Sequence, residues 1–116
     1  MKPGTEMNAN IEWLNNYPIE QQKHLAEVYV SVMQEDIERL ASPQCDKATA
    51  LQIIHRIKGG LASIGDHKLE KTIKIQAQAL EAGDVNLNEF SQVVTKSISH
   101  NIQSIIAWLE NFDVGN

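Results

Sequence analysis

Several residue types are scarce in this chain, and each scarcity excludes a class of structure. The chain has one cysteine, Cys45, so an internal disulfide is impossible. This low cysteine content fits a protein of a reducing compartment. Only 5% of the residues are aromatic. Because Ala, Leu, Ile, Glu, Gln and Lys are abundant in their place, the composition favours an all-α protein over one built from a sheet.

Long hydrophobic runs are also missing. No apolar run approaches the roughly 20 residues that a transmembrane helix needs, and residues 1–10 lack the apolar centre of a signal peptide. The formal net charge of −5 argues against nucleic acid as a partner, because binding to a phosphate backbone needs a basic surface. We therefore expect a cytoplasmic domain that contacts neither nucleic acid nor the membrane directly.

A length of 116 residues corresponds to one domain with a single core. Residues 1–8 are polar and contain Pro3 and Gly4, so we expect a flexible lead or linker there, followed by the domain over residues 9–116. Apolar residues at helical spacing predict a short helix over residues 9–15 and four long helices. The long helices are expected over residues 18–41, 47–65, 67–82 and from 87 to near the C-terminus.

Capping residues define the helix ends. Pro18 fits the first turn of a helix, and Asp46 and Asp66 are suitable N-caps for the next two. Asn86 and Glu89 have the spacing of a capping box at the start of the last helix. Since the connections are short, the fold predicted is an antiparallel up-down-up-down four-helix bundle with a short additional N-terminal helix.

The most informative stretch is the helix that contains His55. One face of this helix is apolar, and His55 points roughly 120–140° away from the middle of that face at about 100° per residue. The imidazole is therefore predicted to be exposed. Lys58 follows at i+3, and Gly59, one turn after His55, leaves the surface flat enough for another protein to approach. A glycine inside a helix costs about 1 kcal/mol relative to alanine, so Gly59 and Gly60 require a reason other than helix stability.

Other histidine chemistries fail on spacing. A di-iron bundle needs Glu-x-x-His on two helices, but the residues three before the four histidines are Gln21, Gln52, Ile64 and Ser97. One cysteine and scattered histidines do not supply a zinc site. His55 also has no acidic residue at i±3 or i±4 that would orient it as a general base. A helix-turn-helix over residues 56–69 is disfavoured by the acidic balance of the chain.

The run His55-Arg56-Ile57-Lys58-Gly59-Gly60-Leu61-Ala62-Ser63-Ile64-Gly65 resembles the signature of histidine phosphotransfer (HPt) domains of bacterial multistep phosphorelays. In that family, His-x-x-Lys-Gly precedes small residues, an apolar residue and a glycine. The chain departs from the family in carrying Gly60 where Ser or Ala is usual. It departs again in carrying Thr72, Ile73 and Gln76 where a Leu-Cys pair and an apolar residue are frequent.

The resemblance implies a phosphorelay carrier. His55 would accept a phosphoryl group on Nε2 from a receiver-domain aspartate and pass it to another, Lys58 would offset the phosphoryl charge, and Gly59 would give the partner clearance. The chain has no nucleotide-binding loop and no acidic cluster for Mg²⁺, so we expect no kinase activity and no cofactor of its own, with Mg²⁺ supplied by the partner receiver. We also expect a monomer.

Two other readings stay open. The chain could bind a receiver-like protein without passing phosphate, in which case His55 would be dispensable, or it could be a bundle-type adaptor unrelated to signalling. The sequence also leaves open whether the domain is free-standing. Its linker-like start favours the C-terminal module of a hybrid sensor kinase, which would tether the domain to the inner membrane.

Overall fold

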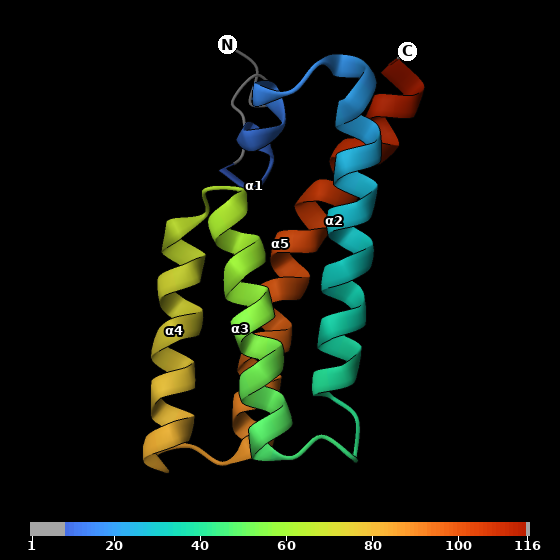
Figure 1. Ribbon diagram of the computed structural model, residues 1–116. Helices are drawn as coiled ribbons and strands as arrows, with labels where there is room; N and C mark the ends of the chain where they lie inside the picture. Colours follow the sequence, from blue (N-terminus) through green and yellow to red (C-terminus); the bar gives the residue numbers. More distant parts are fainter. Residues whose placement is uncertain (1–8, 116) are drawn as a thin grey trace.

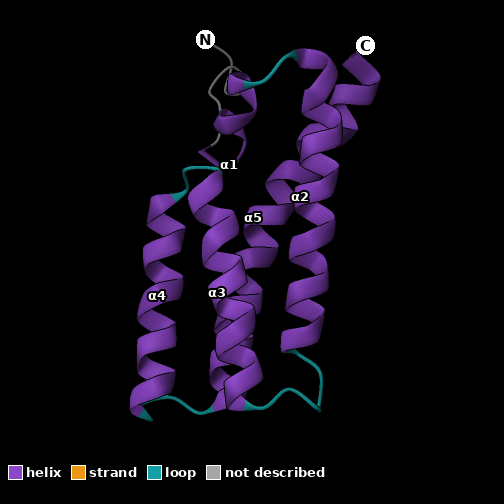
Figure 2. Cartoon of the chain, in the orientation of Figure 1, coloured by secondary structure: helices purple, strands orange, loops and turns teal. Residues whose placement is uncertain are grey.

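The computed structural model describes residues 9–115, and this part of the chain is made of helices joined by short loops, with no strand (Figures 1 and 2). The predicted flexible lead over residues 1–8 lies outside the described residues. The elements are α1 (Ala9–Glu12), the 3₁₀ helix η2 (Trp13–Asn16), α2 (Ile19–Leu40), α3 (Lys47–Ser63), α4 (His67–Ala82) and α5 (Leu87–Gly115).

The four long helices form a bundle in which each helix is antiparallel to the one before it (Figure 1). Going around the bundle, α2 packs against α3 and α5, and α4 packs against α3 and α5. The short α1 packs against α5, and η2 packs against α2. The predicted all-α, up-down-up-down four-helix bundle with a short additional N-terminal helix is confirmed.

Two aspartates begin the middle helices, as the sequence predicts. The Thr49 backbone N–H donates to Asp46 Oδ1 at 2.8 Å, and the Leu69 N–H donates to Asp66 Oδ1 at 3.2 Å. Each bond satisfies a backbone donor that has no partner within its helix. α4 ends at Gly83, whose φ of 81° is a left-handed conformation that glycine adopts without strain.

The ends of α2 and α5 refine the sequence prediction. Asn86 and Glu89 form the full capping box, because each side chain accepts from the backbone N–H of the other, at 2.8 and 3.3 Å. Pro18 occupies the N-cap position of α2, one residue before the predicted first turn. The predicted short helix over residues 9–15 is divided into α1 and η2.

The core runs along the axis of the bundle and is almost entirely aliphatic. α5 supplies a stripe at helical spacing, and α3 supplies a complete buried face. The buried residues of these two helices are Phe90, Val94, Ile98, Ile102 and Ile105 of α5, and Ala50, Ile53, Ile54, Ile57 and Leu61 of α3, with Ile64 directly after α3. Burying one such side chain contributes about 1.5–3 kcal/mol, so these faces determine how each helix is rotated.

The apolar surface of α2 is wider than its two neighbours cover. An apolar surface of this width predicts contacts with two neighbouring helices, and α3 and α5 supply them. Val28 and Val32 nevertheless remain 46% and 42% exposed, and both line a groove between α2 and α3. The apolar width of α2 therefore serves two packed neighbours and one exposed groove.

A buried carboxylate joins α2 to α3. Asp36 of α2 is 1% exposed, and its Oδ1 lies 3.4 Å from Arg56 Nη2 of α3 and 3.8 Å from Arg39 Nη1. Neither contact meets hydrogen-bond geometry, so Oδ1 has ion-pair partners but no hydrogen bond within the described residues. Burial raises the pKa of this carboxyl, and the two arginines oppose that shift only in part.

This shift predicts a pH-dependent effect of Asp36→Asn. Folding raises the pKa of the carboxyl above its ordinary value of 3.8, so the folded state binds this proton more tightly than the unfolded state does. The stabilisation that results is present below the ordinary pKa and is lost as the pH rises through the pKa of the folded state. Asparagine does not titrate. The unfolding free energy of the variant minus that of the wild type should therefore increase from about pH 3 to neutrality.

Urea denaturation of both proteins over this pH range measures the difference directly. Glu38→Gln, at an exposed position of the same helix, is the control for loss of one carboxyl group. A difference for Asp36→Asn that stayed constant or decreased with pH would contradict the burial argument.

Candidate functional site

His55 lies on the exposed side of α3, near the middle of the helix. The buried isoleucine face of α3 points into the bundle, so the imidazole points to solvent, as the helical spacing predicts. No described residue forms a hydrogen bond or an ion pair with the ring. Both ring nitrogens are therefore available to a partner, and α3 fixes the point on the surface from which the side chain extends.

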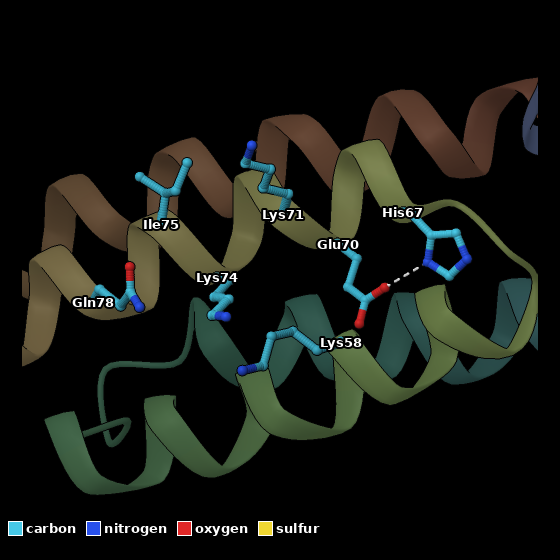
Figure 3. A pocket seen from close by; sticks show the side chains of 7 residues that line it. All are labelled: Lys58, His67, Glu70, Lys71, Lys74, Ile75 and Gln78. Atoms are coloured by element: carbon cyan, nitrogen blue, oxygen red, sulfur yellow. Dashed lines mark hydrogen bonds and ion pairs between the residues drawn. The ribbon is translucent and has the colours of Figure 1, made fainter.

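Lys58 lies one turn after His55 and is half-buried. Residues three apart on a helix are neighbours, with about 5–6 Å between their Cβ atoms, so a group attached to the imidazole lies within reach of the lysine side chain. Figure 3 shows that Lys58 extends into the space between α3 and α4. The lysine consequently occupies the α4 side of His55.

Arg56 occupies the other side. Its guanidinium reaches toward α2, where Asp36 holds it in the ion pair described above. The helical angle of about 100° per residue explains this arrangement, since consecutive residues on α3 turn toward different neighbours. His55 thus lies between two cations, one fixed by a buried carboxylate and one without an ion-pair partner among the described residues.

The two adjacent glycines meet different surroundings. A Cβ atom on Gly60 would lie 2.6 Å from Met33 Cε, so the close contact between α2 and α3 accounts for this glycine. A Cβ atom on Gly59 would have nothing within 4 Å. Packing inside the molecule therefore does not explain Gly59, which is exposed one turn from His55. An external contact remains as a physical reason for its small size.

An apolar groove of about 270 Å³ lies between α2 and α3, and Arg56, the residue after His55, lines it. The exposed Val28 and Val32 and the half-buried Leu25 line its α2 side, and Arg56 and Gly60 line its α3 side. Trp13 and Tyr17 close one end. The sequence predicts that apolar residues on the faces flanking His55, on its own helix and on the preceding long helix, frame a docking surface, but it does not identify them. The structure shows that Leu25, Val28 and Val32 of α2 line this groove.

A second groove of about 540 Å³ lies between α3 and α4, and Lys58 is the α3 residue that lines it (Figure 3). It is lined by Lys58, His67, Glu70, Lys71, Lys74, Ile75 and Gln78. The sequence singles out Lys68, Lys71 and Lys74 as a solvated face, with Lys68 and Lys71 as candidates for a partner surface. The structure places Lys71 and Lys74 at the groove, and Lys68 does not line it.

The other candidates for chemistry are dispersed. His67 is bonded through Nδ1 to Glu70 Oε1 at 3.0 Å, and His24 and His100 are exposed on α2 and α5. Within residues 9–115, no group of three or more His, Cys, Asp and Glu side chains is arranged to hold a metal ion. None of the helices in this range combines the length and hydropathy needed to cross a bilayer.

Comparisons of the chain with protein-family models, with curated proteins and with solved structures found no match. The roles assigned to His55, Lys58 and Gly59 by resemblance to HPt domains therefore stay predictions. The geometry around these residues is the independent argument for a site.

The surroundings of Gly59 predict a gain in stability on substitution. Gly59→Gln should raise the free energy of unfolding by about 1 kcal/mol, because glutamine is a better helix former and its Cβ meets no other atom. Gly60→Ala is the comparison, since its Cβ must displace Met33 and should gain less. Chemical denaturation measures both. A Gly59→Gln protein less stable than the wild type would indicate an internal role for this glycine.

Proposed function

We propose that this domain is a phosphoryl carrier of the HPt type, which accepts a phosphoryl group on His55 from a receiver-domain aspartate and passes it to a second receiver. The observation that carries the proposal is the exposed, unpartnered imidazole in the middle of a rigid helix, with Lys58 beside it and open space at Gly59. The signature around His55 points to the same chemistry.

The transfer uses chemistry available to a neutral imidazole. The lone pair of His55 Nε2 attacks the phosphorus of an aspartyl phosphate, a P–N bond forms, and the P–O bond to the aspartate breaks, which releases a carboxylate. The Nδ1 proton stays on the ring. Lys58 places positive charge near the phosphoryl oxygens, where it stabilises the charge in the transition state and in the phosphohistidine. Return transfer reverses these steps.

The partner supplies what this chain lacks. Phosphoryl transfer depends on positioning and on neutralising charge, for which a receiver domain brings Mg²⁺ bound to its own carboxylates. The carrier contributes the nucleophile, a cation and a docking surface. It has no kinase activity of its own, and it acts in the cytoplasm, either free or as the C-terminal module of a sensor kinase at the inner membrane.

The apolar groove between α2 and α3 is suited to docking the receiver. Isolated exposed apolar residues are common, but Val28 and Val32 lie together in a groove that also includes Arg56, the residue that follows His55 on α3. Apolar side chains that bind in such a groove supply affinity. The absence of a side chain at Gly59 lets the aspartyl phosphate approach the imidazole ring. A monomeric carrier can then exchange one receiver for another on a single surface.

The first test of this function is His55→Gln. A phosphorylated receiver with Mg²⁺ should label the wild type with an acid-labile, comparatively alkali-stable phosphoryl group, and the variant should not be labelled. Binding to the receiver should survive, because an exposed substitution leaves the bundle unchanged. Lys58→Ala should slow transfer or shorten the life of the phosphohistidine. Labelling of His55→Gln, or of the wild type by ATP alone, would overturn the proposal.

The second test concerns docking. Val32→Glu should weaken receiver binding at least about tenfold, since it places a charge in an apolar contact. Val93→Glu is the matched control, because both valines are 42% exposed and Val93 lies on α5, diagonally across the bundle from α3. Calorimetric titration measures the affinities. Equal effects of the two substitutions would show that docking does not use the α2–α3 groove.

A further inference from the structure

Positive charge is concentrated in one part of an acidic molecule. Residues 56–74 contain five of the ten Lys and Arg residues but only two of the fifteen Asp and Glu residues of the chain. Three of these cations, Lys58, Lys71 and Lys74, line the α3–α4 groove (Figure 3). The basic groove therefore has a sign opposite to that of the chain as a whole.

The positive charges of the groove lysines are not neutralised by carboxylates of the groove. Glu70 is the single carboxylate that lines it, and Glu70 Oε1 is bonded to His67 Nδ1 at 3.0 Å. None of the three lysines forms an ion pair with a described residue. In Figure 3, Lys58 of α3 and Lys74 of α4 point into the same space. Positive charges that line the same groove favour binding of an anionic group between them.

The size and walls of the groove indicate what kind of anion fits. A volume of about 540 Å³ accommodates several side chains, and Ile75, which is 52% exposed, adds an apolar wall. A long polyanion would extend past the groove toward the rest of an acidic chain, since thirteen of the fifteen Asp and Glu residues lie outside residues 56–74. A short acidic segment of polypeptide can pair its carboxylates with the lysines and pack its aliphatic carbon atoms against Ile75.

We propose that the α3–α4 groove binds an acidic segment of the protein that exchanges the phosphoryl group with His55, and that this contact selects the partner and speeds its association. This inference rests on the proposed function. Lys58 connects the two sites, because it lies one turn from His55 and also lines the groove. A protein seated over His55 is therefore placed to reach Lys71 and Lys74, and complementary charge raises its association rate.

The first experiment needs no receiver. A short, N-acetylated and C-amidated peptide of alternating Glu and Gly is titrated into the ¹⁵N-labelled domain, with a Gln–Gly peptide as the uncharged control. The amide chemical shifts that the acidic peptide changes should belong mainly to Lys58, Lys71, Lys74 and Ile75. These changes should disappear in the Lys71→Glu/Lys74→Glu double variant and persist in Lys96→Glu. Lys96 is a control because it is exposed on α5, beside α2, on the opposite side of the bundle. Equal shifts with both peptides, or shifts spread over all lysines, would overturn the proposal.

The second experiment measures steering of the phosphorylated receiver. At about 10 mM salt, Lys71→Glu/Lys74→Glu should slow association about tenfold, and at about 1 M salt less than about twofold, because screening removes the attraction. Lys96→Glu should behave as the wild type. Transfer that is normal in the double variant at low salt would overturn the groove proposal and leave the carrier function intact. Peptide binding without transfer from the phosphorylated receiver would show that the groove binds acidic peptides, but it would overturn the carrier function and with it the partner that we assign to the groove.

Sedimentation of the domain alone tests whether a second copy of the chain occupies the groove. The wild type should stay monomeric at low salt. Self-association that the Lys71→Glu/Lys74→Glu variant abolishes would show that a second copy, with its own acidic side chains, fills the groove, and the proposal of an acidic partner would be wrong.

Discussion

Burial of one apolar face of α3 determines the rest of the site. Ile53, Ile54 and Ile57 are almost completely buried, so α3 cannot rotate about its axis without exposing them. With this rotation fixed, the helical angle places His55 in solvent, Arg56 toward α2 and Lys58 toward α4. The arrangement needs no hydrogen bond to the imidazole. The helix and its hydrophobic contacts fix the side of the bundle on which the imidazole lies, and no described residue bonds to either ring nitrogen.

Several features near His55 lower the stability of the bundle and leave the surface around the imidazole open. Gly59 has no internal reason for its small size, although a larger residue would favour the helix by about 1 kcal/mol. Asp36 is buried with a raised pKa, yet it fixes Arg56 at the edge of the apolar groove. Val28 is 46% exposed, and Lys71 and Lys74 form no ion pair with a described residue. These three residues line the two grooves. Asp36 fixes an arginine that lines one groove, and Gly59 lies one turn from His55.

The sequence predicted the bundle well because its signals are local. Asp46, Asp66 and Gly83 mark helix ends through their own backbone bonds or φ angles, and the aliphatic stripes have one helical period. The sequence predicted a docking surface that flanks His55 on its own helix and on the preceding one. It did not show which residues line the grooves, because these depend on how far α2 lies from α3 and α3 from α4. Periodicity placed Val32 on the apolar surface of α2 without showing that it stays exposed, and it gave no sign that Asp36 and Arg56 pair across helices. The chemical roles rest on the resemblance at His55 together with its exposure.

The central claim is that one phosphoryl group is carried by one nitrogen of His55. The most direct measurement is its position: the domain is labelled by a phosphorylated receiver with Mg²⁺, separated from the receiver at alkaline pH, and analysed by fragment mass spectrometry together with ³¹P NMR. We predict a single phosphoryl group on His55, bonded to Nε2, that disappears when a second unphosphorylated receiver is added. A phosphoryl group on His24, His67 or His100, or one that no receiver removes, would contradict the account.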